Sequence, residues 1–171
     1  MRNLAPFSFF TVASVDPPVV CFSPLVRGDG RRKDTIHNLE QTGEFVLNIV
    51  SESFAPQMNA TSAEVDADVD EWVLSGLTPL PSDLVQPPRV AESHVHLECR
   101  LRQIIRFGDN VLAGNLVLGD ILIIDVNEDV LVTVDGQRLI DRDRLQAIGR
   151  MAGESYARTT DCFDLQRPAP R

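Results

Sequence analysis

The opening of the chain holds polar groups in a pattern that suits a flat ligand. Residues 3–8 read Asn-Leu-Ala-Pro-Phe-Ser. Pro6 lacks a backbone donor and restricts Ala5 to extended geometry, so this segment cannot pair fully in a sheet. Its unpaired amides and carbonyls, together with the side chains of Asn3 and Ser8, are available to a planar heterocycle. The alternative is an irregular edge strand that binds no ligand.

A second segment has the composition of a phosphate site. Arg31, Arg32 and Lys33 precede Asp34 and Thr35, which can cap a helix. The first amides of a helix lack partners within it, and the helix dipole adds positive potential there. Free amides, the Thr35 hydroxyl and three cations together favour a phosphate. The alternative is an exposed basic loop before an ordinary helix cap.

The elements that must position these two segments are mostly strands. Short apolar runs alternate with turn residues, which is typical of β structure. The predicted strands cover residues 4–15, 19–22, 44–50, 94–105, 111–126 and 163–165. The two long strands form the strongest predicted hairpin, with its turn at residues 108–110, and Asp135-Gly136 forms another tight turn.

Only short helices are predicted between these strands. One starts at Asp34 and stops at Gly43, and a second covers residues 52–60 with Ser51 as its cap. Further helical turns are predicted near residues 72–74 and 145–148. The sequence therefore predicts a mainly β fold, a β-barrel with a few short helices.

The composition limits the classes of partner. The chain has 171 residues and a net charge of −9. This length suits a single domain over residues 1–171 with a full-sized core. Strong negative charge disfavours nucleic-acid backbones and anionic membranes. No apolar run approaches the roughly 20 residues of a membrane span, and no signal peptide is recognisable. An anionic cofactor stays compatible with this charge, because a local basic cluster can hold it.

The three cysteines, Cys21, Cys99 and Cys162, are odd in number and widely spaced. They predict no disulfide framework and favour a reducing cytoplasm. Cys99 alternates with Leu97 and Leu101 along a predicted strand, which indicates a small core residue rather than a nucleophile.

Other groups of polar residues favour structural roles over ligand binding. His94 and His96 point to the same face of a predicted strand, but the sequence supplies no third metal ligand. The acidic stretch at residues 64–71 lacks the glycine and glutamate that a calcium loop requires, so it is interpreted as a solvated connection. His37 fits an exposed position on the first helix.

In chain order, the motifs of this sequence resemble those of the flavin-reductase-like FMN-binding family. They are Asn-Leu-Ala-Pro-Phe-Ser-Phe-Phe from residue 3, Phe-Ser-Pro from residue 22, Lys-Asp-Thr-x-x-Asn from residue 33 and Glu-Phe-Val-x-Asn from residue 44. The series continues with His-Val-His-Leu-Glu-Cys from residue 94, Gly-Arg-Met-Ala-Gly-x-x-Tyr from residue 149 and Phe-x-Leu-x-Arg-Pro from residue 163. The ordered set covers nearly the whole chain. The resemblance implies an FMN-binding split β-barrel that forms homodimers.

The resemblance also implies which residues hold the cofactor. Those that would border the isoalloxazine ring and the ribityl chain are Asn3, Ala5, Phe7 and Ser8. Those that would lie along the ribityl chain and the phosphate are Ser23, Arg32, Lys33, Asp34 and Thr35. Tyr156 would lie near the same site. No catalytic side chain and no metal are implied, because the flavin carries the redox chemistry.

The activity that the resemblance implies is that of an NAD(P)H-dependent flavin reductase. NADH or NADPH would enter as a transient substrate, and FMN is favoured over FAD. Reduced flavin would pass electrons to oxygen, to free flavin or to a partner such as a monooxygenase. Two alternatives stay open at this point. One is a flavin-binding electron-transfer module without NAD(P)H turnover, and the other is a barrel that serves as an interaction domain without flavin.

The N-terminus is short relative to the family. Members carry a further strand with an Arg-Pro-x-Ala-Trp-Val-Ser-Thr-like motif before the Asn-x-Ala-Pro segment. The Ser-Thr pair of that motif would contact the flavin phosphate. Here Met1 and Arg2 lead directly into Asn3. We therefore expect an unpaired sheet edge where the first strand would lie, which favours association.

Overall fold

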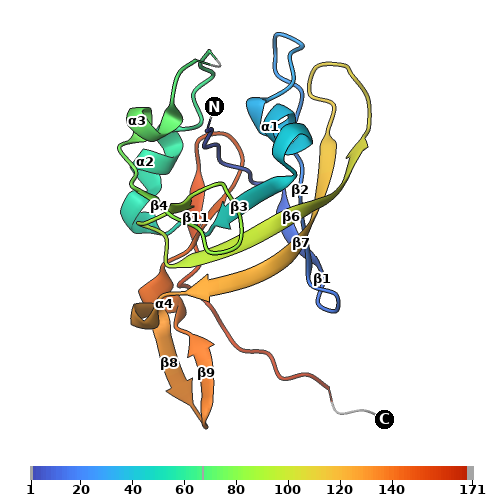
Figure 1. Ribbon diagram of the computed structural model, residues 1–171. Helices are drawn as coiled ribbons and strands as arrows, with labels where there is room; N and C mark the ends of the chain where they lie inside the picture. The colour runs from blue at the N-terminus through green and yellow to red at the C-terminus, as the bar shows by residue number, and fades with distance from the viewer. Residues whose placement is uncertain (1, 67, 169–171) are drawn as a thin grey trace.

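A five-stranded antiparallel sheet forms the body of the protein in this computed structural model, which describes residues 2–66 and 68–168 (Figure 1). The order of its strands is β1-β2-β7-β6-β3. Their bounds are Phe10–Ser14 for β1, Val19–Phe22 for β2, Glu44–Asn48 for β3, Val95–Arg106 for β6 and Asn115–Val126 for β7. The mainly β fold that the sequence predicts is confirmed.

The long hairpin of β6 and β7 is confirmed, with one change at its turn. Its register pairs Val95 with Val126 and Arg106 with Asn115. The returning strand starts four residues later than predicted, because residues 112 and 113 bond to another segment. The Val26 amide donates to the Ala113 carbonyl, and the Leu112 amide donates to the Val26 carbonyl.

Short helices and three two-stranded sheets surround this main sheet (Figure 1). The helical elements are α1 (Asp34–Thr42), η1 (Glu52–Phe54), α2 (Ala55–Ala60), α3 (Glu71–Ser75), η2 (Glu128–Val130) and α4 (Arg142–Leu145). The small antiparallel sheets pair β4 (Pro79–Leu80) with β5 (Arg89–Val90), β8 (Leu131–Val134) with β9 (Gln137–Ile140), and β10 (Ile148–Arg150) with β11 (Tyr156–Arg158). The turn at Asp135-Gly136 joins β8 to β9, as predicted.

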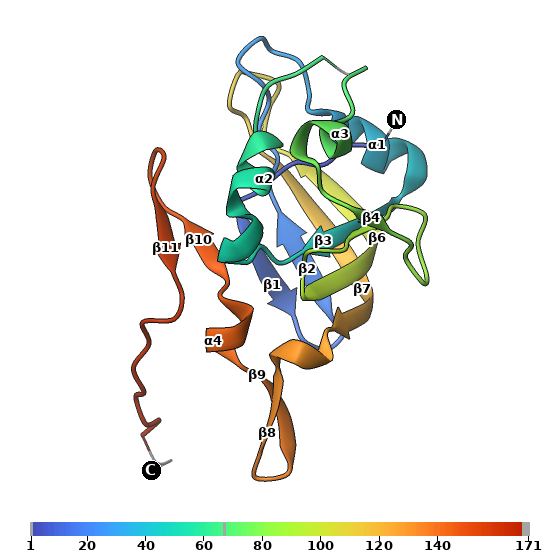
Figure 2. The same cartoon turned by 90° about the vertical axis from the view of Figure 1, so that its left-hand side faces the viewer.

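Two predicted elements have different bounds in the structure, and a third is absent from its described part. The first strand starts at Phe10 and not at residue 4, because Pro6 and the bonds of residues 3 and 4 to helices keep the preceding segment out of the sheet. Ile148 begins β10 and does not continue a helix, since α4 ends where Gln146 adopts the left-handed conformation. Residues 163–165 form no strand; Phe163 and Leu165 are both 82% exposed, on a segment that runs away from the body (Figure 2).

The side chains predicted to cap the first two helices make no capping hydrogen bond. Lys33, and not Asp34 or Thr35, occupies the N-cap of α1, and no side chain caps that helix. Ser51 occupies the N-cap of η1, as predicted, but its hydroxyl donates to the Leu145 carbonyl at 2.6 Å and makes no capping bond. The predicted stop at Gly43 is confirmed: this residue is left-handed (φ 67°), and its amide donates to the Leu39 carbonyl.

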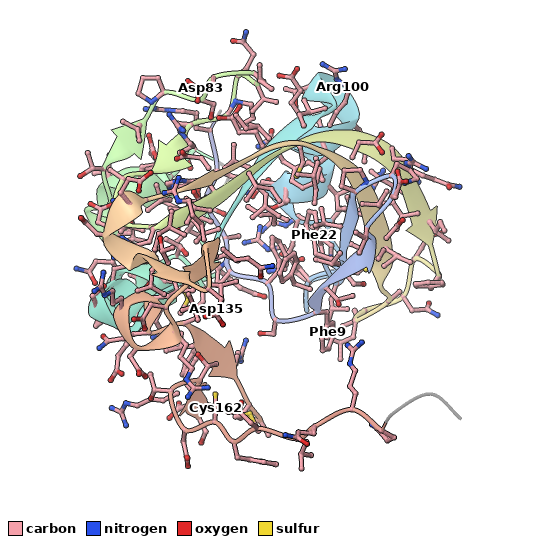
Figure 3. The ribbon with its side chains drawn as sticks, turned by 90° about the horizontal axis from the view of Figure 1, so that it is seen from below. Phe9, Phe22, Asp83, Arg100, Asp135 and Cys162 are labelled. Atoms are coloured by element: carbon pink, nitrogen blue, oxygen red, sulfur yellow. The ribbon has the colours of Figure 1, made fainter. Side chains whose placement is uncertain are left out.

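The main core lies inside the curve of the sheet. Phe22 packs between Phe7 and Phe45, with ring centroids 5.1 Å and 5.3 Å apart. Figure 3 shows Phe22 within the arc of the strands and Phe9 at the rim. Ile36 and Leu39 of α1 are buried against the same cluster. The core therefore fixes α1 and the residues around Phe7 relative to the sheet.

A second core cluster holds α2 and α3 to the opening segment and to β10. Phe54, Met58 and Trp72 are buried there, and the half-buried Leu4 and Ile148 pack against them. No helix in the described part of the chain is long and apolar enough to cross a membrane.

The close approach of β7 to Phe45 makes Gly119→Ala a test of the core. A Cβ at Gly119 would lie 2.3 Å from Cζ of the buried Phe45 ring. We expect this variant to lose about 1–3 kcal/mol of unfolding free energy through overpacking, measured by urea denaturation. Gly28→Ala is the control, because no atom lies within 4 Å of a Cβ added there. Equal stability of the two variants would contradict the packing described here.

Candidate functional site

Side-chain amides fix the opening segment against α1. Asn3 Nδ2 donates to Thr35 Oγ1 at 2.8 Å, and Asn38 Nδ2 donates to Asn3 Oδ1 at 2.7 Å. On the other side, the Leu4 amide donates to Glu71 Oε2 of α3 at 3.3 Å. The segment therefore runs between α1 and α3, as the dark-blue trace shows in two views turned by 90° (Figures 1 and 2).

Arg27 is a buried cation beside this segment. Its side chain is only 9% exposed. One terminal nitrogen donates to the Val65 carbonyl at 2.9 Å, and the other lies 3.8 Å from Asp34 Oδ2. Arg27 Nε is buried and has no hydrogen-bond partner among the described residues. A buried guanidinium whose hydrogen-bonding groups are incompletely satisfied is costly, so this arrangement favours a further acceptor.

The N-terminus of α1 adds further donors at the same place. Within the described residues, the backbone amides of Ile36 and His37 donate to the Lys33 carbonyl, whereas those of Asp34 and Thr35 donate to nothing. Since no side chain caps this nine-residue helix, its first amides and its dipole are available to an anion.

These groups surround one hollow of about 110 Å³, which we call the basic pocket. Its lining residues are Asn3, Ala5, Pro6, Arg27, Lys33, Asp34, Thr35, Thr61, Ser62, Ala63, Glu71 and Arg150. Three of them are cations and two are acids. Helix α1, the loop before it, the end of α2, the start of α3 and β10 all contribute to the wall, so the pocket depends on how these separate elements pack together.

Glu71 lies buried in the wall of the basic pocket. Burial raises the pKa of its carboxyl, and the nearby Asp34 and Asp70 carboxylates raise that pKa further. Hydrogen bonds from the amides of Glu71 itself and of Leu4 partly oppose this rise. The neutral carboxylic acid therefore persists to a higher pH than in an exposed glutamate.

A larger hollow of about 500 Å³, which we call the polar pocket, adjoins the basic pocket. Its lining residues are Asn59, Ser62, Arg150, Gly153, Glu154 and Tyr156. Ser62 and Arg150 line both hollows, so the two form a continuous surface. The hairpin of β10 and β11 contributes four of the six lining residues and lies beside α2 (Figure 2).

A family model described as "Flavin reductase like domain" matches residues 1–142. The chain belongs to this family. The nitrilotriacetate monooxygenase component B of Bacillus cereus is 33% identical, with a TM-score of 0.85 over 95% of this chain and 79% of that chain. The 2-nitrobenzoate 2-nitroreductase NbaA of Pseudomonas fluorescens is 28% identical, with a TM-score of 0.82 over 97% and 77% of the two chains.

The split β-barrel fold that the resemblance implies is confirmed by these comparisons. A structure from Shewanella frigidimarina, described as a flavin reductase with a split barrel domain, is 25% identical with a TM-score of 0.82. The alignment covers 97% of this chain and 79% of that chain. This flavin-reductase-like chain therefore shares its fold with its relatives over nearly all of its length.

Half of the residues predicted for the flavin site line one hollow. They are Asn3, Ala5, Lys33, Asp34 and Thr35, all in the basic pocket. Tyr156 lines the adjoining polar pocket, where its hydroxyl lies 3.5 Å from Asn59 Oδ1. The fold thus brings together segments that are about 30 residues apart in the sequence.

The other four predicted site residues line neither hollow. Phe7 packs on Phe22 in the core, and the exposed Ser8 accepts the Phe10 amide through its carbonyl. The Ser23 amide donates to the Phe9 carbonyl at 3.0 Å. Arg32 lies on the outside of α1, where it pairs with Glu40 at 3.0 Å.

Several residues that line the two pockets were not predicted from the sequence. Arg27 belongs to the same glycine-rich loop as the three predicted cations, but nothing in the sequence shows that it turns inward. Glu71 was interpreted as part of a solvated acidic stretch. Ser62 follows α2 as an ordinary polar helix end, and Arg150 stands in the Gly-Arg-x-x-Gly-x-x-Tyr motif beside Tyr156.

His96 and Cys99, for which the sequence favoured structural roles, are both buried. His96 is buried, with Nδ1 3.2 Å from Asp125 Oδ2 and Nε2 2.8 Å from the Val90 carbonyl. Cys99 is buried in the main core, as predicted, and burial raises the pKa of its thiol to about 12. This thiol is therefore protonated at neutral pH and is not a nucleophile. No group of three potential metal ligands occurs within residues 2–66 and 68–168.

Glu71→Gln tests the electrostatics of the basic pocket. A carboxyl whose pKa is raised by folding contributes stability at low pH that is lost as the pH rises through the raised pKa. Glutamine keeps an acceptor for the Leu4 amide but cannot ionise. We expect the variant to gain unfolding free energy relative to the wild type at about pH 8 and to gain less at about pH 4, below the ordinary pKa of a glutamate.

Urea titrations at the two pH values measure this difference. Glu64→Gln is the control, because Glu64 is exposed on the connection before α3. A gain for Glu71→Gln that is the same at both pH values would show that ionisation of Glu71 is not its cause.

Proposed function

We propose that this chain binds FMN and acts as an NAD(P)H-dependent flavin reductase. The observation that carries the proposal is the buried guanidinium of Arg27, whose Nε is unpaired beside the free amides of α1. This chemistry fits the phosphate of a nucleotide cofactor. Membership of the flavin reductase like domain family and the flavin-related structures among its neighbours support a flavin as that nucleotide.

The proposed phosphate site consists of Arg27, Lys33 and Thr35. Arg27 Nε and the Lys33 ammonium would donate to phosphate oxygens, while the Asp34 and Thr35 amides complete the set of donors. The Thr35 hydroxyl already accepts from Asn3 Nδ2, so its own proton is free to be donated outward. Asn3 thereby couples the opening segment to the phosphate site.

The size of the basic pocket suits one end of the cofactor. Pockets for whole small molecules measure roughly 300–1,000 Å³, whereas the basic pocket measures about 110 Å³. It would therefore hold the phosphate end of FMN, while the Asn3–Ala5–Pro6 wall would face the remainder of the cofactor. The backbone of that wall lacks sheet partners and can donate to or accept from the ring. That Ser8 and Ser23 contact the flavin stays a prediction.

When bound, FMN supplies the redox chemistry, since it accepts a hydride from NADH or NADPH and passes electrons on. The protein has a positioning role. Asn3 orients the wall through Thr35 and Asn38, and Glu71 holds the Leu4 amide. No side chain of this site is needed as an acid or base, which agrees with a site built mainly from backbone and cations.

A second candidate is a flavin-binding electron-transfer module without NAD(P)H turnover. Anaerobic mixing of the FMN-loaded protein with NADH or NADPH distinguishes the two candidates. The reductase proposal predicts that flavin absorbance bleaches with saturable dependence on the nicotinamide nucleotide. Stable flavin binding without bleaching would contradict the reductase and favour the electron-transfer module.

We further propose that the whole chain is one domain that acts as a homodimer in the cytoplasm. Exposed apolar side chains support the dimer: Val12 and Val15 lie on or beside β1, and Val134, Leu139 and Ile140 lie on the projecting β8–β9 hairpin. The free cysteines support a reducing compartment. A partner monooxygenase fits the likeness to a monooxygenase component B. A purely monomeric species in sedimentation velocity would contradict the dimer.

Lys33→Ala combined with Thr35→Ala tests the proposed phosphate site. Charge-assisted hydrogen bonds contribute about 1.5–3 kcal/mol each, so we expect FMN affinity to fall by about tenfold or more. Quenching of flavin fluorescence on binding measures that affinity. Arg32→Ala provides the matched comparison, because Arg32 pairs with Glu40 outside the pocket and its loss should change affinity by less than about twofold. Unchanged affinity in the double variant would contradict the site.

A further inference from the structure

We infer that Asn38 is a positioning residue that makes the basic pocket selective for an ionised phosphate. Asn38 acts through Asn3 and Thr35 and does not itself line the pocket. The inference rests on the proposed function, because that proposal assigns the basic pocket to the phosphate of FMN. It is carried by the direction of the two hydrogen bonds that join these three side chains.

One face of α1 presents two polar side chains to the opening segment. Thr35 and Asn38 are three residues apart in this helix, so their side chains are neighbours on its surface. The Asn3 amide bridges them: its Oδ1 accepts from Asn38 Nδ2 at 2.7 Å, and its Nδ2 donates to Thr35 Oγ1 at 2.8 Å. All three residues are half-buried. They form a continuous chain of hydrogen bonds, which we call the amide relay.

The amide relay has a direction that Asn38 determines. A side-chain amide donates through its nitrogen and accepts through its oxygen, so the two ends of the Asn3 amide are not interchangeable. Because Asn38 supplies a donor, the oxygen of Asn3 faces Asn38 and the nitrogen faces Thr35. The hydroxyl oxygen of Thr35 is therefore an acceptor on the side of Asn3.

The relay leaves the proton of the Thr35 hydroxyl for the pocket. A hydroxyl has a single proton, and Thr35 Oγ1 already uses a lone pair to accept from Asn3. Within the described part of the chain, this hydroxyl donates to no other group. Thr35 lines the basic pocket at the uncapped start of α1. The hydroxyl and the amides of Asp34 and Thr35 therefore all present hydrogens to a ligand at this corner.

Such a set of donors suits an ionised phosphate better than a neutral hydroxyl. Phosphate oxygens accept charge-assisted hydrogen bonds, which are about twice as strong as bonds between neutral groups. The Asp34 carboxylate also lines the pocket, but it lies 3.8 Å from the Arg27 guanidinium, which compensates its charge. The amide relay therefore increases the preference of the pocket for FMN over riboflavin, which ends in a hydroxyl.

The substitution Asn38→Asp reverses the direction of the relay. A carboxylate accepts but does not donate, so the Asn3 amide turns over and donates its nitrogen to the new carboxylate. The Asn3 oxygen then faces Thr35 and accepts the hydroxyl proton. The Thr35 hydroxyl consequently presents lone pairs to the pocket, and these repel a phosphate oxygen. Packing changes little, because aspartate has nearly the size and shape of asparagine.

Titrations of FMN and riboflavin, followed by flavin fluorescence, test this reversal. We expect Asn38→Asp to weaken FMN binding by about tenfold or more and to change riboflavin affinity by less than about threefold. Asn38→Leu has a similar size and imposes no reversed direction, so it should weaken FMN binding by only about threefold. A purely structural role of Asn38 predicts the opposite order and equal losses for the two ligands, and either result overturns the inference.

The charge that Asn38→Asp adds is separated from the reversal by a second background, Thr35→Val. Valine has the shape of threonine but no hydroxyl to reverse, so Asn38→Asp should weaken FMN binding there by less than about threefold. Gln41→Glu adds the same charge at an exposed position of α1 outside the pocket and should change FMN affinity by less than about twofold. An effect of Asn38→Asp that is equally large in both backgrounds would identify charge repulsion as its cause and overturn the inference.

The outcomes keep this inference distinct from the proposed function. If the wild type prefers FMN over riboflavin and Asn38→Asp keeps that preference, the relay is overturned and the function is not. If the wild type binds no FMN, the proposed function is contradicted, and inorganic phosphate titrated by calorimetry is the probe of the relay. The relay then predicts a loss of about tenfold or more in phosphate affinity for Asn38→Asp, and the absence of this loss overturns it. Urea denaturation first checks that each variant folds; if Asn38→Asp does not, the phosphate-specific loss in Asn38→Leu is the test, and an equal loss for FMN and riboflavin overturns the inference.

Discussion

A buried guanidinium is the constraint on which the candidate site depends. Removing a charged group from water costs several kcal/mol unless other groups compensate for the lost hydration. Among the described residues, Arg27 has a hydrogen bond to the Val65 carbonyl and lies 3.8 Å from the Asp34 carboxylate, while its Nε is left without a partner. The fold holds this incompletely satisfied cation beside a helix N-terminus that also lacks a cap. An anion that enters the pocket satisfies both, so binding would add stability that folding alone does not supply.

The rest of the fold keeps that cation in place. Phe22 and the α1 residues Ile36 and Leu39 share one core, which fixes the ends of the loop that carries Arg27. The second core holds α2 and α3, whose ends form the opposite wall. Asn3 connects the opening segment to α1, and Glu71 connects it to α3. Because these contacts come from four different elements, the pocket is a product of tertiary packing and not of one local motif.

Local patterns were sufficient to predict much of the fold. The β6–β7 hairpin follows from two long apolar alternations around Gly108, and the end of α1 follows from Gly43, which adopts the left-handed conformation. The strand predicted at residues 163–165 was wrong, because a short apolar run does not show whether a neighbouring strand is available for pairing. The split barrel was predicted only from the ordered family motifs. The contact of Phe22 with Phe45 depends on the order of the strands in the sheet, and no local sequence pattern predicts that order.

The candidate site was predictable to a smaller extent. Asn3 and Lys33–Thr35 were found because proline and a helix start leave backbone groups unpaired in any context. The direction of each cation could not be predicted: Arg32 turns outward to Glu40, whereas Arg27 turns inward. Burial of Glu71 and the meeting of Ser62 with Arg150 depend on contacts between residues that lie far apart in the sequence.

The most direct test of the central claim is a comparison of FMN with riboflavin, which lacks the phosphate, as ligands of the wild-type chain. Both affinities are measured by fluorescence titration at the same ionic strength. If the basic pocket holds the phosphate, FMN binds about 100-fold or more tightly than riboflavin, and added salt reduces this ratio. Equal affinity for the two ligands would contradict the account, since the buried cation and the free helix amides would then have no part in binding.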